Sequence, residues 1–522
     1  MSVRKSIVLL LTGLLLCTLV HAESDIVSYS SDIVFTIDGR NLSMGEMLNL
    51  LLKNNYDLRS QRHDYRMADS DSRKYEQKFA PYVTGEVGAG STTYPDDLHT
   101  STGEQKDTWD VTTSIRKAFK TGTTVSGGVG TEYSKTTDMP LGVSPQFDET
   151  GNITGMEPVA RDMEGYQPSV YLMVEQQLLK NGFGVNDRKM TELLENSADI
   201  NRESVKAQMS GAAASLIISF WELALARESR TNAQIKLSET IKVRNIVSEN
   251  VKLGLAENFD LNYYNALVAG ARISREQAQQ QLEDKRRNIR TMLALDPTVE
   301  IGETVELHTK LPELDRDQIL HLAMTRRSDY RIAQLSLKSA RQQIAINENE
   351  DLPELKGSAS VNTFGYHEEF TDSMAFGGSG YEIRMTMTHP LSNPEQDTNL
   401  RDARLSLEKA KLSLEKTERE IRDDIESRIQ NVNTTFEVYR QARAARIQSR
   451  VYYQKMQANL RRGRFTAATV KNGLDAYIDS KQNELQALVG YNIALVQLDI
   501  ATNMIFEKFG IDVTSYMQRG IE

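Results

Sequence analysis

Cysteine is almost absent from this chain of 522 residues, which contains only Cys17. Cys17 lies in an apolar run that follows two basic residues, and the stretch Met1 to Ala22 has the order of a secretory signal peptide. Leu16 stands where a lipoprotein signal would have a small residue, so we expect no lipid attachment. Removal of residues 1–22 would leave no cysteine, which excludes disulfide bonds, a thiol nucleophile and thiolate metal ligands.

Long apolar runs are also missing beyond residue 22. No later stretch has 18 consecutive apolar residues, so the sequence predicts no transmembrane helix. If the protein crosses a membrane, β-strands must do it. The formal net charge is -10. It becomes about -12 without the signal peptide, which argues against nucleic acid as a partner.

Recognisable catalytic and metal sites are missing as well. The seven histidines are scattered without paired ligand spacing, so His308 and His367 are predicted to be surface residues. Gly85, Gly88 and Gly90 imitate a nucleotide-binding loop, but they lie within a strand pattern and no helix follows. The sequence therefore predicts a protein that is not an enzyme and has no cofactor or metal.

An internal repeat is present at a constant offset of 272 residues. Its matched positions are Leu42, Asp57, Leu58, Arg59 and Pro81 in the first half, and Leu314, Asp329, Tyr330, Arg331 and Pro353 in the second. The segments between these positions carry apolar residues at helical spacing, and the pattern changes to alternation after each proline. Each half is therefore predicted to begin with a helix, broken once near Asn54 or Arg327, and to continue into strands.

This pattern predicts a duplicated organisation of helices and strands. Residues 1–22 form the signal peptide, 23–41 an extended segment, 42–295 the first repeat, 296–313 a connector, 314–510 the second repeat and 511–522 a tail. The first repeat contains a helix over 42–78, strands 83–90 and 166–175, an inserted hairpin 109–133, a long helix 186–253 and a return helix 260–295. The second contains a helix over 315–349, strands 355–366 and 381–388, a long helix 399–462 and a return helix 467–509. Glycine and proline predict a long loop over 138–164.

The stretch from Tyr381 to Thr388 alternates most clearly. Its polar positions are Glu382, Arg384, Thr386 and Thr388, and Tyr381, Ile383, Met385 and Met387 lie between them. Such a strand has one apolar and one wet face, and its expected partner is the strand 355–366. The sequence does not tell whether the hairpin 109–133 joins this sheet or caps it.

Together these features resemble the TolC family of outer-membrane efflux and secretion channels, over nearly the whole chain after residue 22. The resemblance is carried by the repeated openings, by the prolines before the strands, and by motifs at the strand exits and helix turns. These motifs are Gln177-Leu178-Leu179, His389-Pro390-Leu391, Gly254 with Asp260, and Gly463 with Thr469.

The resemblance implies a mixed α and transmembrane β fold. Three copies would pool their strands into one outer-membrane β-barrel and their long antiparallel helices into a trimeric α-barrel that crosses the periplasm. Glu382, Arg384, Thr386 and Thr388 would then face the barrel lumen, and the apolar positions would face lipid. The implied partners are a periplasmic adaptor protein and, through it, an inner-membrane RND or ABC transporter. The implied location is the outer membrane of a Gram-negative bacterium.

In the family, the two helix turns form a gated periplasmic mouth that engages the adaptor. The residues of this sequence at those turns are Gly254, Asp260, Gly463, Arg464, Thr469 and Asn472. Thr469 and Asn472 occupy places where carboxylates often ring the aperture, so a less negative mouth is expected; Asp475 lies one turn further in. Arg461, Arg462 and Arg464 are interpreted either as partners of acidic residues on a neighbouring helix or as solvated charges at a helix C-terminus.

The leading hypothesis is a passive exit duct of a tripartite efflux or type I secretion system. A second hypothesis is an exported coiled-coil protein, such as a periplasmic scaffold or an adhesin stalk, because long amphipathic helices suit both. The transported substrate cannot be inferred from the sequence, since a wide duct selects little.

Overall fold

The computed structural model describes residues 34–37, 40–95, 103–254, 257–304, 307–460 and 466–518. The chain divides into two compact units. The first takes its residues from 1–68, 199–335 and 412–522, and the second from 69–198 and 336–411. Three helices contribute residues to both: α6 (Val185–Lys252), α9 (Ser328–Glu350) and α11 (Pro394–Leu460).

The first unit is mainly helical. Besides its parts of α6, α9 and α11, it contains α2 (Met44–Asn54), α3 (Tyr56–Met67), α7 (Asn258–Met292), α8 (Arg316–Arg326), α12 (Ala467–Ala501), η4 (Glu507–Phe509) and α13 (Val513–Gln518). Its small antiparallel sheet has the order β2-β1-β7, with β1 at Val34–Ile37, β2 at Arg40–Ser43 and β7 at Ile301–Thr304. The sequence predicted only an extended segment and a connector here, because strands of four residues are too short to show alternation.

The opening helices of the two halves are each interrupted by an extended residue. Asn55 ends α2, and its side chain accepts a hydrogen bond from the backbone N–H of Leu58, which caps α3. Arg327 has extended backbone angles between α8 and α9. The predicted helix over 42–78 has a further interruption at Ala68 and Asp69, before α4 (Ser70–Glu76) and η1 (Gln77–Phe79) of the second unit.

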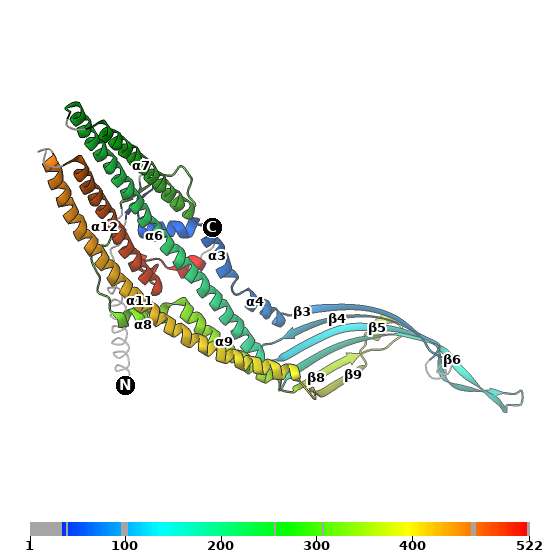
Figure 1. The fold of residues 1–522 in the computed structure, drawn as a ribbon. Helices are drawn as coiled ribbons and strands as arrows, with labels where there is room; N and C mark the ends of the chain where they lie inside the picture. Colours follow the sequence, from blue (N-terminus) through cyan, green and yellow to red (C-terminus); the bar gives the residue numbers. More distant parts are fainter. Residues whose placement is uncertain are drawn as a thin grey trace, which may run out of the picture. The chain divides into compact units, whose positions relative to one another are not determined.

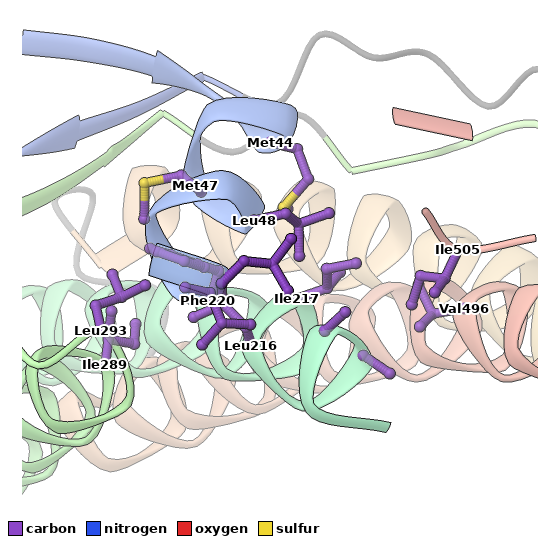
Figure 2. Close-up of a cluster of buried hydrophobic side chains, with 14 of the residues drawn as sticks. Met44, Met47, Leu48, Leu216, Ile217, Phe220, Ile289, Leu293, Val496 and Ile505 are labelled. Carbon is purple, nitrogen blue, oxygen red and sulfur yellow. The ribbon is translucent and has the colours of Figure 1, made fainter. Parts of the chain in front are cut away.

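A buried apolar cluster holds the first unit together (Figure 2). Met44, Met47 and Leu48 follow helical spacing along α2, and their side chains are completely buried. They pack in one cluster with Leu216, Ile217 and Phe220 of α6, Ile289 of α7, Leu293, Val496 of α12, and Ile505. The short α2 is therefore fixed by burial against the long helices.

One described helix is long and apolar enough, by length and composition, to cross a membrane. It is the segment Gly182–Lys252, whose most apolar window of 18 residues has a mean hydropathy of 1.5. Of this window, 61% is buried inside the protein, and Leu216, Ile217 and Phe220 of the core cluster belong to the same helix. Burial against other helices explains the apolar composition of α6.

The second unit is built on a six-stranded antiparallel sheet with the order β3-β4-β5-β6-β8-β9 (Figure 1). The strands are Tyr82–Thr93, Gln105–Ala118, Thr123–Phe147, Ile153–Gln177, Glu354–Phe364 and Gly378–Thr388. The hairpin expected at 109–133 lies within the sheet as β4 and β5. The expected partnership of 355–366 with 381–388 corresponds to the pairing of β8 with β9. The short elements η3 (Gly182–Gly184) and α10 (Phe370–Ser373) complete the unit.

The prediction of a long loop over 138–164 is wrong. β5 and β6 continue to pair as far as Phe147 and Ile153, in a long hairpin that extends beyond the other strands (Figure 1). Prolines and glycines suggested a loop, but three register shifts accommodate this irregular stretch within the ladder. The turn itself is short, and Asp148 accepts hydrogen bonds there from Thr150 and Asn152.

The start of α6 is anchored within the second unit by Asp187, whose side chain is 5% exposed. Its carboxylate accepts hydrogen bonds from Tyr75 Oη at 2.8 Å, Lys78 Nζ at 2.6 Å and Asn181 Nδ2 at 2.8 Å. Gly184 has a φ of +74°, and a Cβ there would lie 1.9 Å from the carbonyl oxygen of Lys120. This junction therefore requires both a buried carboxylate and a glycine.

Candidate functional site

The six-stranded sheet has one continuous apolar face, which is exposed. The register places Val83, Ile115, Gly127, Leu172, Val361 and Tyr381 in one row across all six strands. Neighbouring rows on this face contain Val87, Val111, Val129, Val170, Val174, Ile383 and Met385. Val87, Tyr381 and Ile383 are each more than four-fifths exposed. Among the described residues, Phe370 of α10 packs against Tyr166 at one end of this face, and most of the apolar side chains of the six strands remain exposed.

The opposite face is polar. Glu382, Arg384, Thr386 and Thr388 lie on it, opposite Ser360, Ser358, Lys356 and Glu354 of β8. Arg384 pairs with Glu382, Lys356 pairs with Glu354, and Lys106 lies 3.9 Å from Glu132. The four residues expected to line a lumen thus share one polar face with charges of both signs.

Several glycines of the polar face lie beneath side chains of the neighbouring strand. On that face, a Cβ at Gly88 would lie 2.2 Å from Asp110 Oδ1, and one at Gly130 would lie 2.7 Å from Thr112 Oγ1. On the apolar face, a Cβ at Gly85 would meet nothing within 4 Å. Side chains from the neighbouring strand therefore lie over the glycines of the polar face, where a side chain at the glycine itself would clash.

Both edges of the sheet are open. Among the described strands, β3 pairs only with β4, and β9 pairs only with β8. β3 has 12 residues and β9 has 11. Long, exposed, apolar edge strands promote association with further strands, and a closed barrel removes such edges.

An aromatic row crosses the apolar face near the β3–β4 loop. Trp109, Tyr133 and Tyr166 come from adjacent strands β4, β5 and β6, with ring centroids 5.7 Å apart for Trp109 and Tyr133 and 4.9 Å apart for the two tyrosines. Aromatic rings with one polar end concentrate at the boundary between lipid and water. The row therefore marks a boundary of the apolar band.

Those predicted mouth residues that the structure describes lie at or near helix ends of the first unit. Gly254 follows α6 with a φ of +71°, and its N–H donates to the carbonyl of Val251. Asp260 occupies the third position of α7, where its carboxylate accepts from the backbone N–H of Glu257 at 3.3 Å. Leu253, Phe259 and Tyr263 around this turn are more than half exposed. Gly463 and Arg464, with Arg461 and Arg462, lie outside the described residues.

Thr469 takes part in the N-terminal cap of α12, which the sequence interpretation missed. Its backbone N–H donates to Thr466 Oγ1 at 3.3 Å at the start of α12, the same helical position that Asp260 holds in α7. The Thr466-x-x-Thr469 pattern was visible in the sequence as a variant of a capping box. Asn472 is exposed, whereas its neighbour Gly473 is buried against Met456.

Asp475 lies between two lysines, Nζ of Lys471 at 2.6 Å and Nζ of Lys236 at 3.1 Å. Burial raises the pKa of Asp475, but the hydrogen bonds from the two lysines outweigh this effect and hold the pKa below its usual value. The charged carboxylate is therefore compensated within one copy, and it links α12 to α6. Tyr453 of α11 also contacts α6, donating to Glu239 at 2.9 Å.

Comparison with solved structures identifies the fold. A membrane protein of Pseudomonas aeruginosa matches with a TM-score of 0.63 and 15% identity, over 88% of this chain and 90% of that one. The open state of the MtrE outer-membrane channel of Neisseria gonorrhoeae matches with a TM-score of 0.61 and 14% identity, over 92% and 94%. The CmeC outer-membrane channel of Campylobacter jejuni matches with a TM-score of 0.61 and 12% identity, over 91% and 89%.

The chain has the fold of an outer-membrane channel. The resemblance inferred from the sequence is thereby confirmed at the level of the fold. No protein-family model matches the chain, and no curated protein matches its sequence. OprN, MtrE and CmeC, which share this fold, are described as outer-membrane channels. The channel fold was detectable in the sequence only through the order and duplication of weak motifs.

Proposed function

We propose that the protein is a passive exit channel of the outer membrane of a Gram-negative bacterium. Three copies form one β-barrel in the lipid and one helical duct in the periplasm, built from two halves of duplicated origin. A periplasmic adaptor engages the helical tips, and an RND or ABC transporter of the inner membrane drives the substrate in tripartite efflux or type I secretion. No cofactor is required, because the channel only gates diffusion.

The observation that carries this proposal is the six-stranded sheet with one exposed apolar face and one polar face. Burying a large apolar side chain stabilises a protein by about 1.5 to 3 kcal/mol, so an exposed face of this extent needs a cover. Lipid covers the outside of a barrel, while water fills the inside. Tyr381, Ile383 and Met385 then face lipid, and Glu382, Arg384 and Thr386 face the lumen.

The strand order supports closure by several copies. The sheet has six antiparallel strands, so its two edge strands, β3 and β9, run in opposite directions. β9 of one copy can therefore pair antiparallel with β3 of the next, and the alternation continues around a ring. This arrangement pairs every edge, as a structure in lipid requires.

The helical tips suit a regulated mouth. Leu253, Phe259 and Tyr263 form an exposed apolar patch beside Gly254, which offers a surface for the adaptor. The contacts of Tyr453 with Glu239, and of Asp475 with Lys236, hold α11 and α12 against α6. Opening the mouth would require these contacts between helices to separate. The chain matches the structure of MtrE in its open state, which supports the proposal that the mouth of this channel can open.

Cell fractionation distinguishes the channel from an exported coiled-coil scaffold. We expect the protein to stay with the outer membrane through washes at high salt and high pH, to require detergent for release, and to run as a heat-resistant trimer. A scaffold would be released without detergent. A detergent-independent monomer would therefore overturn the proposed function.

The mouth is expected to bind divalent cations weakly, because Thr469 and Asn472 carry no charge. Replacing both by aspartate should strengthen divalent-cation block about tenfold, since three copies would add six carboxylates to one aperture. Aspartate at position 469 also preserves the cap of α12. The measurement is the cation concentration for half-block in planar bilayers, and Asn433→Asp, which adds a charge at an exposed position of α11, is the control. Unchanged block would show that these positions do not line the aperture.

A further inference from the structure

The two halves contribute unequally to the sheet. The second half supplies β8 and β9, which enter after Pro353 and leave before His389. The first half supplies β3 after Pro81 and β6 before Leu178, with β4 and β5 between them. β3 and β6 thus correspond to β8 and β9 by their entry and exit motifs. β4 and β5 have no counterpart in the second half.

The register is compatible with an inserted pair of strands. Val83 of β3 and Gly127 of β5 both lie opposite Ile115, and Thr93 and Thr137 both lie opposite Gln105. A constant offset of 44 residues therefore relates β3 to β5 along this whole length. Residues that lie opposite one another in paired strands face the same side of a sheet, so each residue of β3 faces the same side as the residue of β5 that shares its partner in β4. Without the inserted strands, β3 could pair with β6 in the place of β5. Its apolar residues would still lie on the apolar face of the sheet, and its polar residues on the polar face.

We propose that β4 and β5 widen the duct where it crosses the membrane and set the size of cargo that it passes. This inference rests on the proposed function. With strands about 4.8 Å apart and tilted by about 40°, a ring of 18 strands has a backbone diameter of about 36 Å. A ring of 12 strands, with four from each copy, would measure about 24 Å. The wider duct suits bulky cargo such as a polypeptide chain with secondary structure.

The inserted strands also contribute to the wall of the lumen. Thr112 and Asp110 of β4 and Gly130 of β5 lie on the polar face, on the same side as Thr386 of β9. Mixed charges and hydroxyl groups on this face give no strong preference for one sign of charge. Width, more than charge, is therefore the property that β4 and β5 add.

Single-cysteine variants test whether β4 lines the lumen, and a mature chain without cysteine provides a clean background. We expect a small membrane-impermeant maleimide, added to intact cells, to label Thr112→Cys and Thr386→Cys. Val111→Cys, on the apolar face, should react at least tenfold more slowly. If Thr386→Cys is labelled and Thr112→Cys is not, the inference about β4 and β5 is overturned, whereas the proposed function stands. Absence of labelling at Thr386→Cys would instead count against the proposed function.

Deletion of residues 94–137 tests the width, because it joins β3 to the distal part of β5 in register. The probes are maleimides attached to polyethylene glycol of graded size, which react with Thr386→Cys in the full and shortened chains. The largest probe that reacts should decrease in diameter by roughly 10 Å in the shortened channel. An unchanged limit in assembled trimers would overturn the inference. If the shortened chain does not assemble, the labelling of Thr112→Cys in the full chain decides whether the inference holds.

Discussion

Replacing Lys508 by methionine is expected to lower the free energy of unfolding of the helical unit by about 4 kcal/mol. Lys508 Nζ lies 2.8 Å from Asp499 Oδ2, and the two side chains are 13% and 8% exposed. Burial raises the pKa of Asp499 and lowers that of Lys508, so each charge depends on the other. The variant would leave the Asp499 carboxylate buried without its ammonium partner.

A double variant provides the control. Asp499→Leu combined with Lys508→Met replaces the ion pair by apolar groups of similar volume, and it should recover most of the lost stability. Thermal unfolding of the purified protein, followed by circular dichroism, measures all three proteins. A single variant as stable as the wild type, or a double variant as unstable as the single, would contradict the prediction.

Replacing Asp187 by asparagine is expected to cost about 3 kcal/mol at neutral pH, because hydrogen bonds to a buried carboxylate are lost. Burial raises the pKa of Asp187, but the hydrogen bonds from Lys78, Asn181 and Tyr75 outweigh burial and hold the pKa below its usual value. A lowered pKa in the folded state stabilises the protein above the pKa of the unfolded chain, which is about 3.9 for Asp. That contribution is lost as the pH falls through the folded pKa.

The stability gap between the wild type and Asp187→Asn should therefore be constant from about pH 5 to pH 8 and shrink below about pH 4. Thermal midpoints across this range provide the measurement. Asp71→Asn is a suitable control, because Asp71 and its partner Lys74 are both largely exposed and an exposed pair contributes little. A gap that persists unchanged at pH 3 would show that the charge of Asp187 is not the stabilising feature.

The strand from Tyr381 to Thr388 was predictable because its alternation is strict and one face must avoid water. The stretch 138–164 was not, because prolines and glycines that usually mark loops here occupy strands with register shifts. Strands β1 and β2 escaped prediction because strands of four residues are too short to show alternation, and β7 because its pairing with β1 across more than 250 residues leaves no local pattern. Patterns in sequence thus report local periodicity, whereas long-range pairing depends on the assembled fold.

The same distinction applies to the candidate site. The placement of Glu382, Arg384, Thr386 and Thr388 on one face follows from alternation, and the register agrees with it. The charge compensation of Asp475 by Lys236 could not be foreseen, because it requires α6 and α12 to be neighbours. The crowding at Gly88 and Gly130 could not be foreseen either, because it depends on side chains of the neighbouring strand.

The claim that copies of this chain enclose a water-filled duct is tested most directly by reconstituting the purified protein into planar lipid bilayers. We expect heat-resistant trimers to insert and to give small, discrete, cation-influenced conductance steps, because the proposed mechanism gates the duct at its periplasmic mouth. Heat-dissociated protein should give none. Trimers that insert without any conductance, or a protein that remains strictly monomeric, would contradict the channel proposal.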